Sequence, residues 1–173
     1  VVPVPMILRS ADLMFISVVA NKFMLLPLTF IFCVASAQTN GVQDARKVLR
    51  SLKSPSELID ITPMVEAFGS ISDEADRTRL GNVMARVRML LLFDRSAKHD
   101  ALVLGTSNKT ELLLGYGTLH GDLASALNPI GDLYKTQVRE LGRYLRIPKS
   151  IQTKPPSADL YPDQSDEEDL GFR

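Results

Sequence analysis

Apolar residues recur along the chain with two different periods, which together predict alternating helices and strands. Residues 42–52 carry apolar side chains at helical spacing, namely Val42, Ala45, Val48, Leu49 and Leu52. Residues 57–61 alternate and predict a short strand. Thr62 followed by Pro63 predicts a helix start, with Thr62 as the N-cap and proline at the first helical position. Residues 72–99 contain no proline and predict one long helix.

The second half of the chain continues this alternation. Residues 101–104 are continuously apolar, as in a strand at the centre of a parallel sheet. Residues 133–145 predict an amphipathic helix with Leu133, Val138, Leu141 and Leu145 facing inward. The alternation indicates an α/β fold, a parallel sheet flanked by helices on both faces. The chain has 173 residues, enough for one domain with its own core, so we expect residues 1–173 to form a single domain.

A strongly apolar stretch from Leu13 to Ala37 admits two interpretations. Lys22 is its only charged residue, and it ends on Ala-Ser-Ala, the small-x-small form of a signal-peptidase site. A secreted or membrane-attached protein would explain this composition. However, Lys22 and Pro27 interrupt the run, and buried strands of parallel sheets are equally apolar. We therefore favour two buried strands, or a strand and a helix, and expect no membrane partner.

The composition excludes several classes of function. The chain carries 20 basic and 20 acidic residues, so its net charge gives no reason to expect nucleic acid as a partner. Cys33 is the only cysteine, which excludes an intramolecular disulfide and a cysteine-based zinc cluster. Two histidines are too few for a histidine-rich metal site.

The apolar run at 101–104 is followed by an unusually polar break, Gly-Thr-Ser-Asn-Lys, and then by Glu111. Ligands of open α/β sheets bind beyond the carboxyl ends of strands, and Gly105 would let a ligand approach the backbone there. Glu111 offers the hard oxygen that magnesium prefers. An ordinary strand-to-helix turn is the alternative, with Thr106 or Ser107 as the N-cap and Glu111 near the positive end of the helix dipole.

Longer motifs favour the ligand site. The segments GTSNKTELLLGYGTLHGDL, NPIGDLYKTQVRELGRYLRIP and KPPSADLYPDQSDEEDLG closely resemble ammonia-dependent NAD synthetases, which belong to the adenylate-forming ATP pyrophosphatases. GNVMARVRMLLLFDRSA extends the resemblance upstream, and SAQTNGVQDARKV and IDITPMVEAF do so more loosely. The resemblance covers about residues 36–172 and implies the Rossmann-like fold of the adenine nucleotide alpha hydrolases.

The resemblance implies roles for six residues. Thr106, Lys135 and Ser157 correspond to positions that contact ATP, and Glu111 corresponds to the magnesium ligand. Arg86 corresponds to a residue that contacts deamido-NAD, and Asp122 belongs to the loop near that substrate.

Each of these residues also has a purely structural interpretation. Lys135 could be a solvated surface lysine. However, it lies in the first turn of a predicted helix, where a cation opposes the dipole, and that local conflict favours a functional role. Arg86 could be ordinary surface charge, and Ser157 could close a turn.

The implied activity is a ligase reaction of NAD biosynthesis. The nicotinate carboxylate of deamido-NAD attacks the α-phosphorus of ATP, and pyrophosphate leaves. Ammonia then displaces AMP from the acyl adenylate and forms the amide of NAD. No nucleophilic side chain is required, so we assign no catalytic residue. The resemblance further implies free ammonia as the nitrogen source, ATP and Mg²⁺, a homodimer and a cytoplasmic location. The apolar positions Met84, Val87, Leu90 and Leu91 of the predicted long helix would supply the dimer face.

Two departures from the family pattern keep a second interpretation open. Some members have a lysine and an aspartate for the dinucleotide where this chain has Leu119 and Ala126. The family also holds the phosphates of ATP with a Ser-Gly-Gly-x-Asp-Ser loop, whereas no glycine precedes Gly41 here. We therefore expect a domain incomplete at both ends. The alternative to a ligase is a catalytically impaired family member, or a non-catalytic dimer partner.

Overall fold

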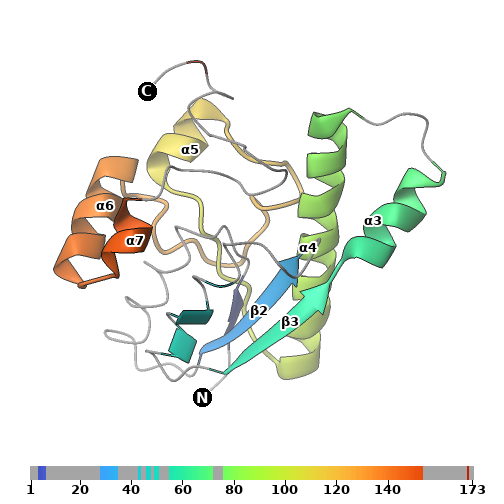
Figure 1. Cartoon of the computed structure of the whole chain (residues 1–173), viewed down its shortest axis with the longest axis horizontal. Helices are drawn as coiled ribbons and strands as arrows, with labels where there is room; N and C mark the ends of the chain where they lie inside the picture. Colours follow the sequence, from blue (N-terminus) through green and yellow to red (C-terminus); the bar gives the residue numbers. More distant parts are fainter. Residues whose placement is uncertain are drawn as a thin grey trace.

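The computed structural model describes residues 4–6, 28–34, 43, 46, 47, 49, 50, 55–71, 76–153 and 171. Its strands and helices run in the order β1 (Val4–Met6), β2 (Leu28–Val34), β3 (Ser56–Asp60), α3 (Thr62–Gly69), α4 (Arg77–His99), α5 (Lys109–Leu114), α6 (Lys135–Tyr144) and α7 (Lys149–Gln152). Figure 1 shows these elements coloured along the chain.

The three strands form one parallel sheet in the order β1-β2-β3. In the register, Val4 pairs with Leu28, Phe30 with Ser56, and Val34 with Asp60. Parallel neighbours need a crossover connection, so long stretches of chain separate each strand from the next. The strand predicted at 57–61 is confirmed and begins one residue earlier, at Ser56. Strand β2 lies within the apolar stretch from Leu13 to Ala37, so part of that stretch is a strand of the parallel sheet. Among the described residues, no helix combines the length and apolar character needed to cross a bilayer.

Helix α4 packs against β1, β2 and α3. Asp76 is its N-cap, and its side chain accepts a hydrogen bond of 2.7 Å from the backbone N–H of Arg79. Lys98 and His99 lie in the last turn, where cations suit the dipole. The long helix was therefore predicted correctly at its end, but its start was placed too early, because Asp76 already has an extended backbone.

The main apolar core lies beneath α4. Ile61, Met84, Leu92 and Val103 form a buried cluster, and Ile59, Val65, Leu80, Val87 and Leu91 pack against it. This corrects the predicted dimer face. Met84 is buried, and Val87 and Leu91 face the core, so of the four residues expected at that face only Leu90 is largely exposed, at 55%.

Helix α3 begins one residue before the predicted first helical position, Pro63, and has a different cap. Ile61 is the N-cap, Thr62 is the first helical residue and Pro63 follows it. The backbone N–H of Thr62 donates to Oδ1 of Asp60 at 2.9 Å. Hydrogen bonds from Thr62 lower the pKa of the exposed Asp60 carboxyl, so this contact stabilises the fold at neutral pH and is lost as the pH falls through that lowered value.

The apolar run at 101–104 is not a strand of the three-stranded sheet. It makes a single parallel bridge, from Leu104 to Leu127. Val103 is fully buried, but Leu102 is 54% exposed, so the run lacks the two covered faces of a central strand. The backbone N–H groups of Ala126 and Leu127 donate to the carbonyl of Val103 instead.

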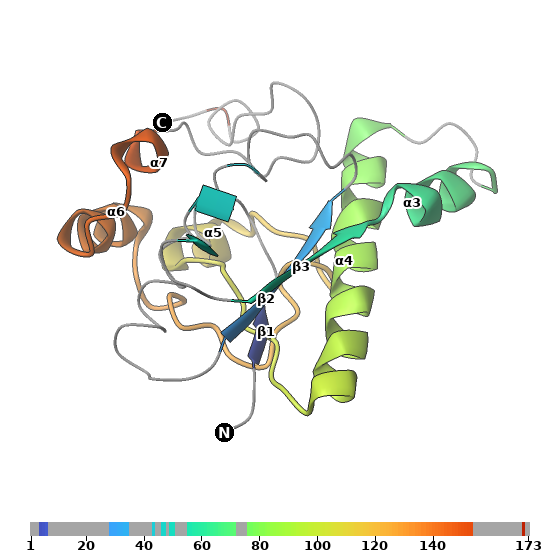
Figure 2. The same cartoon turned by 60° about the horizontal axis from the view of Figure 1, so that its bottom comes forward.

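The remaining helices complete an α/β arrangement. In both views α6 and α7 lie on the opposite side of the sheet from α4 (Figures 1 and 2). Gln43, Arg46, Lys47, Leu49 and Arg50 are helical, in agreement with the stripe predicted over 42–52. Helix α6 falls within the predicted residues 133–145 and buries Val138. The predicted fold class, a parallel sheet with helices on both faces, is confirmed.

The core assignment can be tested with two leucines. Leu92 is 1% exposed, so Leu92→Ala should lower the free energy of unfolding by about 3 kcal/mol through lost burial and a cavity. Leu102→Ala, at 54% exposure, should change it by less than about 0.5 kcal/mol. Urea denaturation of the purified protein measures both. Equal losses in the two variants would contradict the packing described for α4.

Candidate functional site

The polar break ends in a helix cap that satisfies two backbone donors. Asn108 is the N-cap of α5, and its Oδ1 accepts from the backbone N–H of Glu111 at 3.1 Å. The Glu111 carboxylate in turn accepts from the backbone N–H of Asn108, also at 3.1 Å, which completes a capping box. The prediction that Thr106 or Ser107 caps the helix is therefore wrong.

Residues 105–108 of the break are all buried, which is unusual for a connecting segment. The exposed fractions are 1% for Thr106, 3% for Ser107, 0% for Asn108 and 3% for Glu111. Asn128 supports this stretch from the following loop, because its side-chain amide donates to the carbonyl of Ser107 at 2.8 Å. Buried polar groups need hydrogen-bond partners. Several of these partners, such as Asn128, come from residues that follow α5 in the sequence.

Gly105 has a different purpose from the one predicted. A Cβ built on Gly105 would lie 2.5 Å from Oγ of Ser125 and 3.2 Å from Oδ1 of Asn128. The space that a side chain would take is thus filled by the chain itself, and its backbone N–H bonds to Leu127 at 2.7 Å. Close packing against residues 125–128, rather than the approach of a ligand, accounts for glycine at this position.

An ion pair joins two of the predicted site residues. Nζ of Lys135 lies 2.8 Å from Oε1 of Glu111, across 24 residues of sequence. The Glu111 side chain is 4% exposed and the Lys135 side chain 24%. A carboxylate removed from water to this extent needs a cation and hydrogen bonds, and Lys135 and the backbone of Asn108 supply them.

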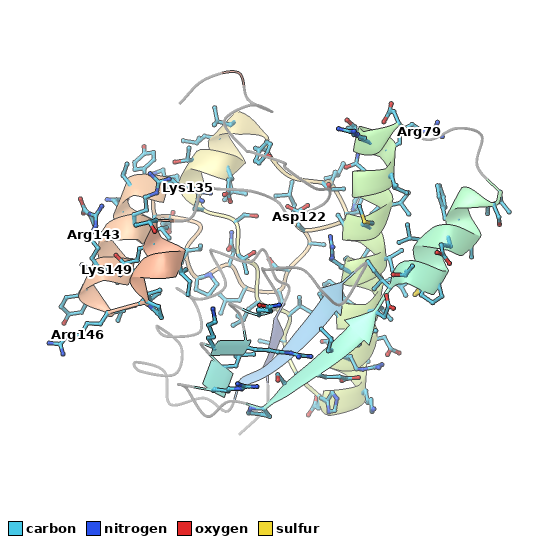
Figure 3. All side chains as sticks on the ribbon, viewed as in Figure 1. Arg79, Asp122, Lys135, Arg143, Arg146 and Lys149 are labelled. Atoms are coloured by element: carbon cyan, nitrogen blue, oxygen red, sulfur yellow. The ribbon has the colours of Figure 1, made fainter. Side chains whose placement is uncertain are left out.

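Helix α6 is held against α5 at the point where this pair forms. The backbone N–H of Lys135 donates to Oγ1 of Thr110 at 3.1 Å, and that of Lys109 donates to the carbonyl of Leu133 at 2.8 Å. Nζ of Lys109 lies 4.9 Å from the centre of the Tyr134 ring, a cation–π contact. Figure 3 shows Lys135 at the end of α6 that approaches α5. The first turn of α6 is therefore fixed relative to Glu111, which explains a cation at a position that the dipole disfavours.

Two buried polar atoms, on the asparagines that bond to this stretch, have no hydrogen-bond partner among the residues that the structure describes. They are Nδ2 of Asn108, a donor, and Oδ1 of Asn128, an acceptor. A buried polar atom without a partner costs about 1–3 kcal/mol, so a polar ligand group that reached either atom would be favoured.

The carboxylate chemistry of the site fits magnesium only together with a ligand. Among the residues described, no three His, Cys, Asp or Glu side chains gather as a metal-binding group. Magnesium often takes one or two carboxylates and completes its octahedron with phosphate oxygens and water. Glu111 can supply such a carboxylate, and a nucleotide would have to supply further oxygens.

Two further predicted residues, Arg86 and Asp122, lie at a second cluster formed by α4 and the loop that follows α5. Nε of the exposed Arg86 donates to the carbonyl of Leu119 at 3.3 Å. Oδ1 of Asp122 accepts from the backbone N–H of Thr118 at 2.8 Å, so Asp122 closes the loop that Arg86 contacts. Figure 3 shows Asp122 between α5 and α4.

The structure thus brings Glu111 together with Lys135, and Arg86 together with the loop of Asp122. Thr106 lies in the buried stretch that leads to Glu111. Ser157 lies outside the described residues, so its predicted contact with ATP stays a prediction.

Comparison with known proteins decides the family. A family model described as NAD synthase matches residues 17–173. The chain belongs to this family. The match begins well before residue 36, where the resemblance read from motifs began, and it therefore includes β2.

Individual relatives agree with the family. The chain is 57% identical over 138 residues to an NH(3)-dependent NAD(+) synthetase of Pelodictyon phaeoclathratiforme, covering 80% of this chain and 50% of the relative. It is 62% identical over 116 residues to the NH(3)-dependent NAD(+) synthetase of Chlorobaculum tepidum, covering 67% of this chain and 42% of the relative. The chain thus spans about half the length of the curated relatives it matches.

Two solved structures share the fold over most of the chain. An NMN synthetase from Francisella tularensis superposes with a TM-score of 0.87 at 32% identity, covering 99% of this chain and 73% of that chain. An NH3-dependent NAD synthetase from Campylobacter jejuni superposes with a TM-score of 0.83 at 35% identity, covering 88% of this chain and 67% of that chain.

Residue patterns alone missed three contributors to these clusters. Asn108 was detectable, because Asn followed three residues later by Glu is a capping-box pattern. Asn82 and Asn128 were not, because each bonds to a segment distant in sequence, at Thr118 and Ser107 respectively. Only the fold shows which loop each of these side chains meets.

The ion pair makes a prediction about stability. Lys135→Met leaves the Glu111 carboxylate buried without its cation and should lower the free energy of unfolding by about 3 kcal/mol. Lys149→Met, at an exposed position of α7, should change it by less than about 0.5 kcal/mol. A double-mutant cycle of Lys135→Met with Glu111→Gln, measured by urea denaturation, should show coupling above about 1 kcal/mol. Additive effects would mean that the two side chains do not interact.

Proposed function

We propose that this chain is part of an ammonia-dependent NAD synthetase and contributes the ATP and deamido-NAD contacts of its active site. The reaction would activate the nicotinate carboxylate with ATP and form the amide with ammonia, releasing AMP and pyrophosphate. Support comes from the family match together with relatives of this name at 52–62% identity.

The single observation that carries the proposal is the ion pair between Glu111 and Lys135. Two separate motifs of the chain supply these residues, and their charged groups lie 2.8 Å apart in a largely buried setting. A structural salt bridge alone does not account for the adjacent donor of Asn108, which has no partner among the described residues. A polyanionic ligand with a divalent cation would suit both signs of charge and would offer an acceptor to the Asn108 donor.

Within this proposal, each residue acts on a different part of the nucleotide. Lys135 would bind the triphosphate and offset the charge that develops on the leaving pyrophosphate. Glu111 would hold Mg²⁺, which when bound neutralises phosphate charge. Thr106 would orient ATP through its hydroxyl, and Ser157 would add a further ATP contact. The rate would come from alignment and charge neutralisation rather than from a nucleophilic side chain, so we assign no catalytic residue.

Deamido-NAD would bind at the second cluster. Arg86 is exposed, and a guanidinium binds carboxylates and phosphates through paired donors. Asp122 would act on this substrate through the loop that it closes, because its carboxylate accepts from the backbone of Thr118.

We also propose a single domain over residues 1–173, a homodimer and a cytoplasmic location, where ATP is available as co-substrate. Exposed apolar side chains support a protein–protein contact. They include Met64 and Phe68 on α3, and Leu90 and Phe93 on α4. Met64 and Phe68 are four residues apart on α3, and Leu90 and Phe93 are three apart on α4, so each pair presents neighbouring apolar side chains, as interfaces do.

Two other functions remain as alternatives. A catalytically impaired family member is disfavoured by the intact pairing of Glu111 with Lys135. Amidation of a mononucleotide is favoured by one observation, the similarity in fold to the Francisella tularensis NMN synthetase. Such an activity would make NMN from its carboxylate precursor with the same ATP chemistry.

Turnover assays test the proposal. The protein is incubated with ATP, Mg²⁺ and ammonia, and with either deamido-NAD or the mononucleotide carboxylate, and NAD or NMN is quantified by chromatography. We expect NAD from deamido-NAD. Faster turnover of the mononucleotide would favour the NMN synthetase alternative, and neither product would favour the impaired family member.

The role of Glu111 has its own prediction. Glu111→Ala should lower Mg²⁺-dependent turnover by at least about 100-fold, because the metal loses its protein carboxylate. Circular dichroism should show a retained fold. Glu140→Ala, on the exposed side of α6, is the matched control and should keep wild-type turnover. Unchanged turnover in Glu111→Ala would show that the metal binds elsewhere.

A further inference from the structure

The loop of residues 117–123 is attached to one face of α4 by two hydrogen bonds. Oγ1 of Thr118 donates to Oδ1 of Asn82 at 2.7 Å, and Nε of Arg86 donates to the carbonyl of Leu119 at 3.3 Å. Asn82 and Arg86 are four residues apart in sequence, so they lie on the same side of the helix. Two successive residues of the loop are therefore held by two successive turns of α4.

Close packing reinforces this attachment. A Cβ added to Gly121 would lie 3.0 Å from Cβ of Ala85 and 2.9 Å from Cγ2 of Thr118. Ala85 lies between Asn82 and Arg86 on the helix and is buried. The loop thus lies against α4 with no room for a larger side chain at either contact.

The loop also closes on itself around Thr118. The backbone N–H of Thr118 donates to Asp122 at 2.8 Å, and the carbonyl of Thr118 accepts from Gly121 at 2.9 Å. His120, inside the turn, has a φ of 57°, which is uncommon for a residue other than glycine. Such a backbone conformation persists when the surrounding contacts determine it. The hydrogen bond from the Thr118 side chain to Asn82 is one of the contacts that hold this turn on α4.

These contacts constrain Arg86. Its hydrogen bond to Leu119 uses one of the five N–H donors of a guanidinium. If the loop moved, the carbonyl that fixes Arg86 would move with it. The hydroxyl of Thr118 can therefore control an arginine that it does not touch.

We propose that Asn82 and Thr118 are a positioning pair, which holds the loop of residues 117–123 on α4 and thereby places the Arg86 guanidinium for the anionic dinucleotide. The proposal rests on the proposed function for the identity of that ligand. It assigns neither residue a direct contact with the ligand. It also predicts that the pair acts on dinucleotide affinity and leaves ATP affinity unchanged.

Three variants test the pair. Thr118→Val keeps the shape of the side chain and removes the hydroxyl donor, while Thr118→Ser keeps the donor. Asn82→Leu removes the acceptor. We expect Thr118→Val to raise the KM for deamido-NAD about tenfold, since a lost hydrogen bond corresponds to about that factor. The KM for ATP and kcat should stay within about twofold, and Thr118→Ser should remain within about twofold of wild type in all three.

The combination of variants separates a shared contact from two independent effects. Asn82→Leu with Thr118→Val should weaken dinucleotide binding no more than either change alone, because both remove the same hydrogen bond. An additive loss, an equal loss of ATP affinity, or a failure of Thr118→Ser to restore binding would overturn the proposal.

Hydrogen exchange of the backbone amides gives a readout that does not depend on turnover. In the absence of substrates, Thr118→Val should increase exchange of residues 117–123 while α6 keeps its protection, and Thr118→Ser should not. Unchanged exchange in Thr118→Val would contradict the positioning pair. A wild-type protein that forms no NAD would instead contradict the proposed function, so the two failures are distinguishable.

Discussion

The arrangement of the candidate site depends on a carboxylate that is buried and ion-paired. Glu111 is 3% exposed, and both of its oxygens take part in contacts, one with Lys135 and one with the backbone of Asn108. A charge in such a setting is stable only with its partners in place. The start of α5 and the start of α6 are consequently fixed relative to each other, and residues between them form the loop that runs over α4.

The same constraint explains why two polar clusters coexist on one short stretch of chain. From Gly115, which ends α5 with a φ of 67°, the chain turns toward α4 and reaches the contacts of Thr118. It then returns to the buried break, where Asn128 bonds to Ser107, and continues into α6. The proposed ATP contacts Glu111 and Lys135 therefore lie at the two ends of one connected loop, and the proposed dinucleotide contacts lie along its middle and on the helix that it crosses. This arrangement suits a reaction that joins the two substrates.

Local patterns predicted the regular elements of this structure well and its irregular ones poorly. The end of α4, the strand β3 and the helix α6 follow from periodicity and charge. Residues 101–104 were predicted to be a central strand and are not one. Leu102 lies exposed, and an apolar composition does not reveal that. For the site, motif resemblance selected Glu111 and Lys135, which the fold joins. The hydrogen bonds of Asn82 and Asn128 depend on tertiary contacts that no local pattern encodes.

Main-chain atoms provide much of the connection between α5 and α6. The donor of Lys109 and the acceptor of Leu133 both belong to the backbone, as does the donor of Lys135 toward Thr110. The side chains at positions 109 and 133 can therefore be replaced without loss of the hydrogen bond that joins the two helices. Proline is the exception at 109 and 135, because it lacks the N–H that each link uses. Side-chain changes at positions 109 and 133 thus leave this backbone link intact, whereas changes at Glu111 or Lys135 remove the ion pair.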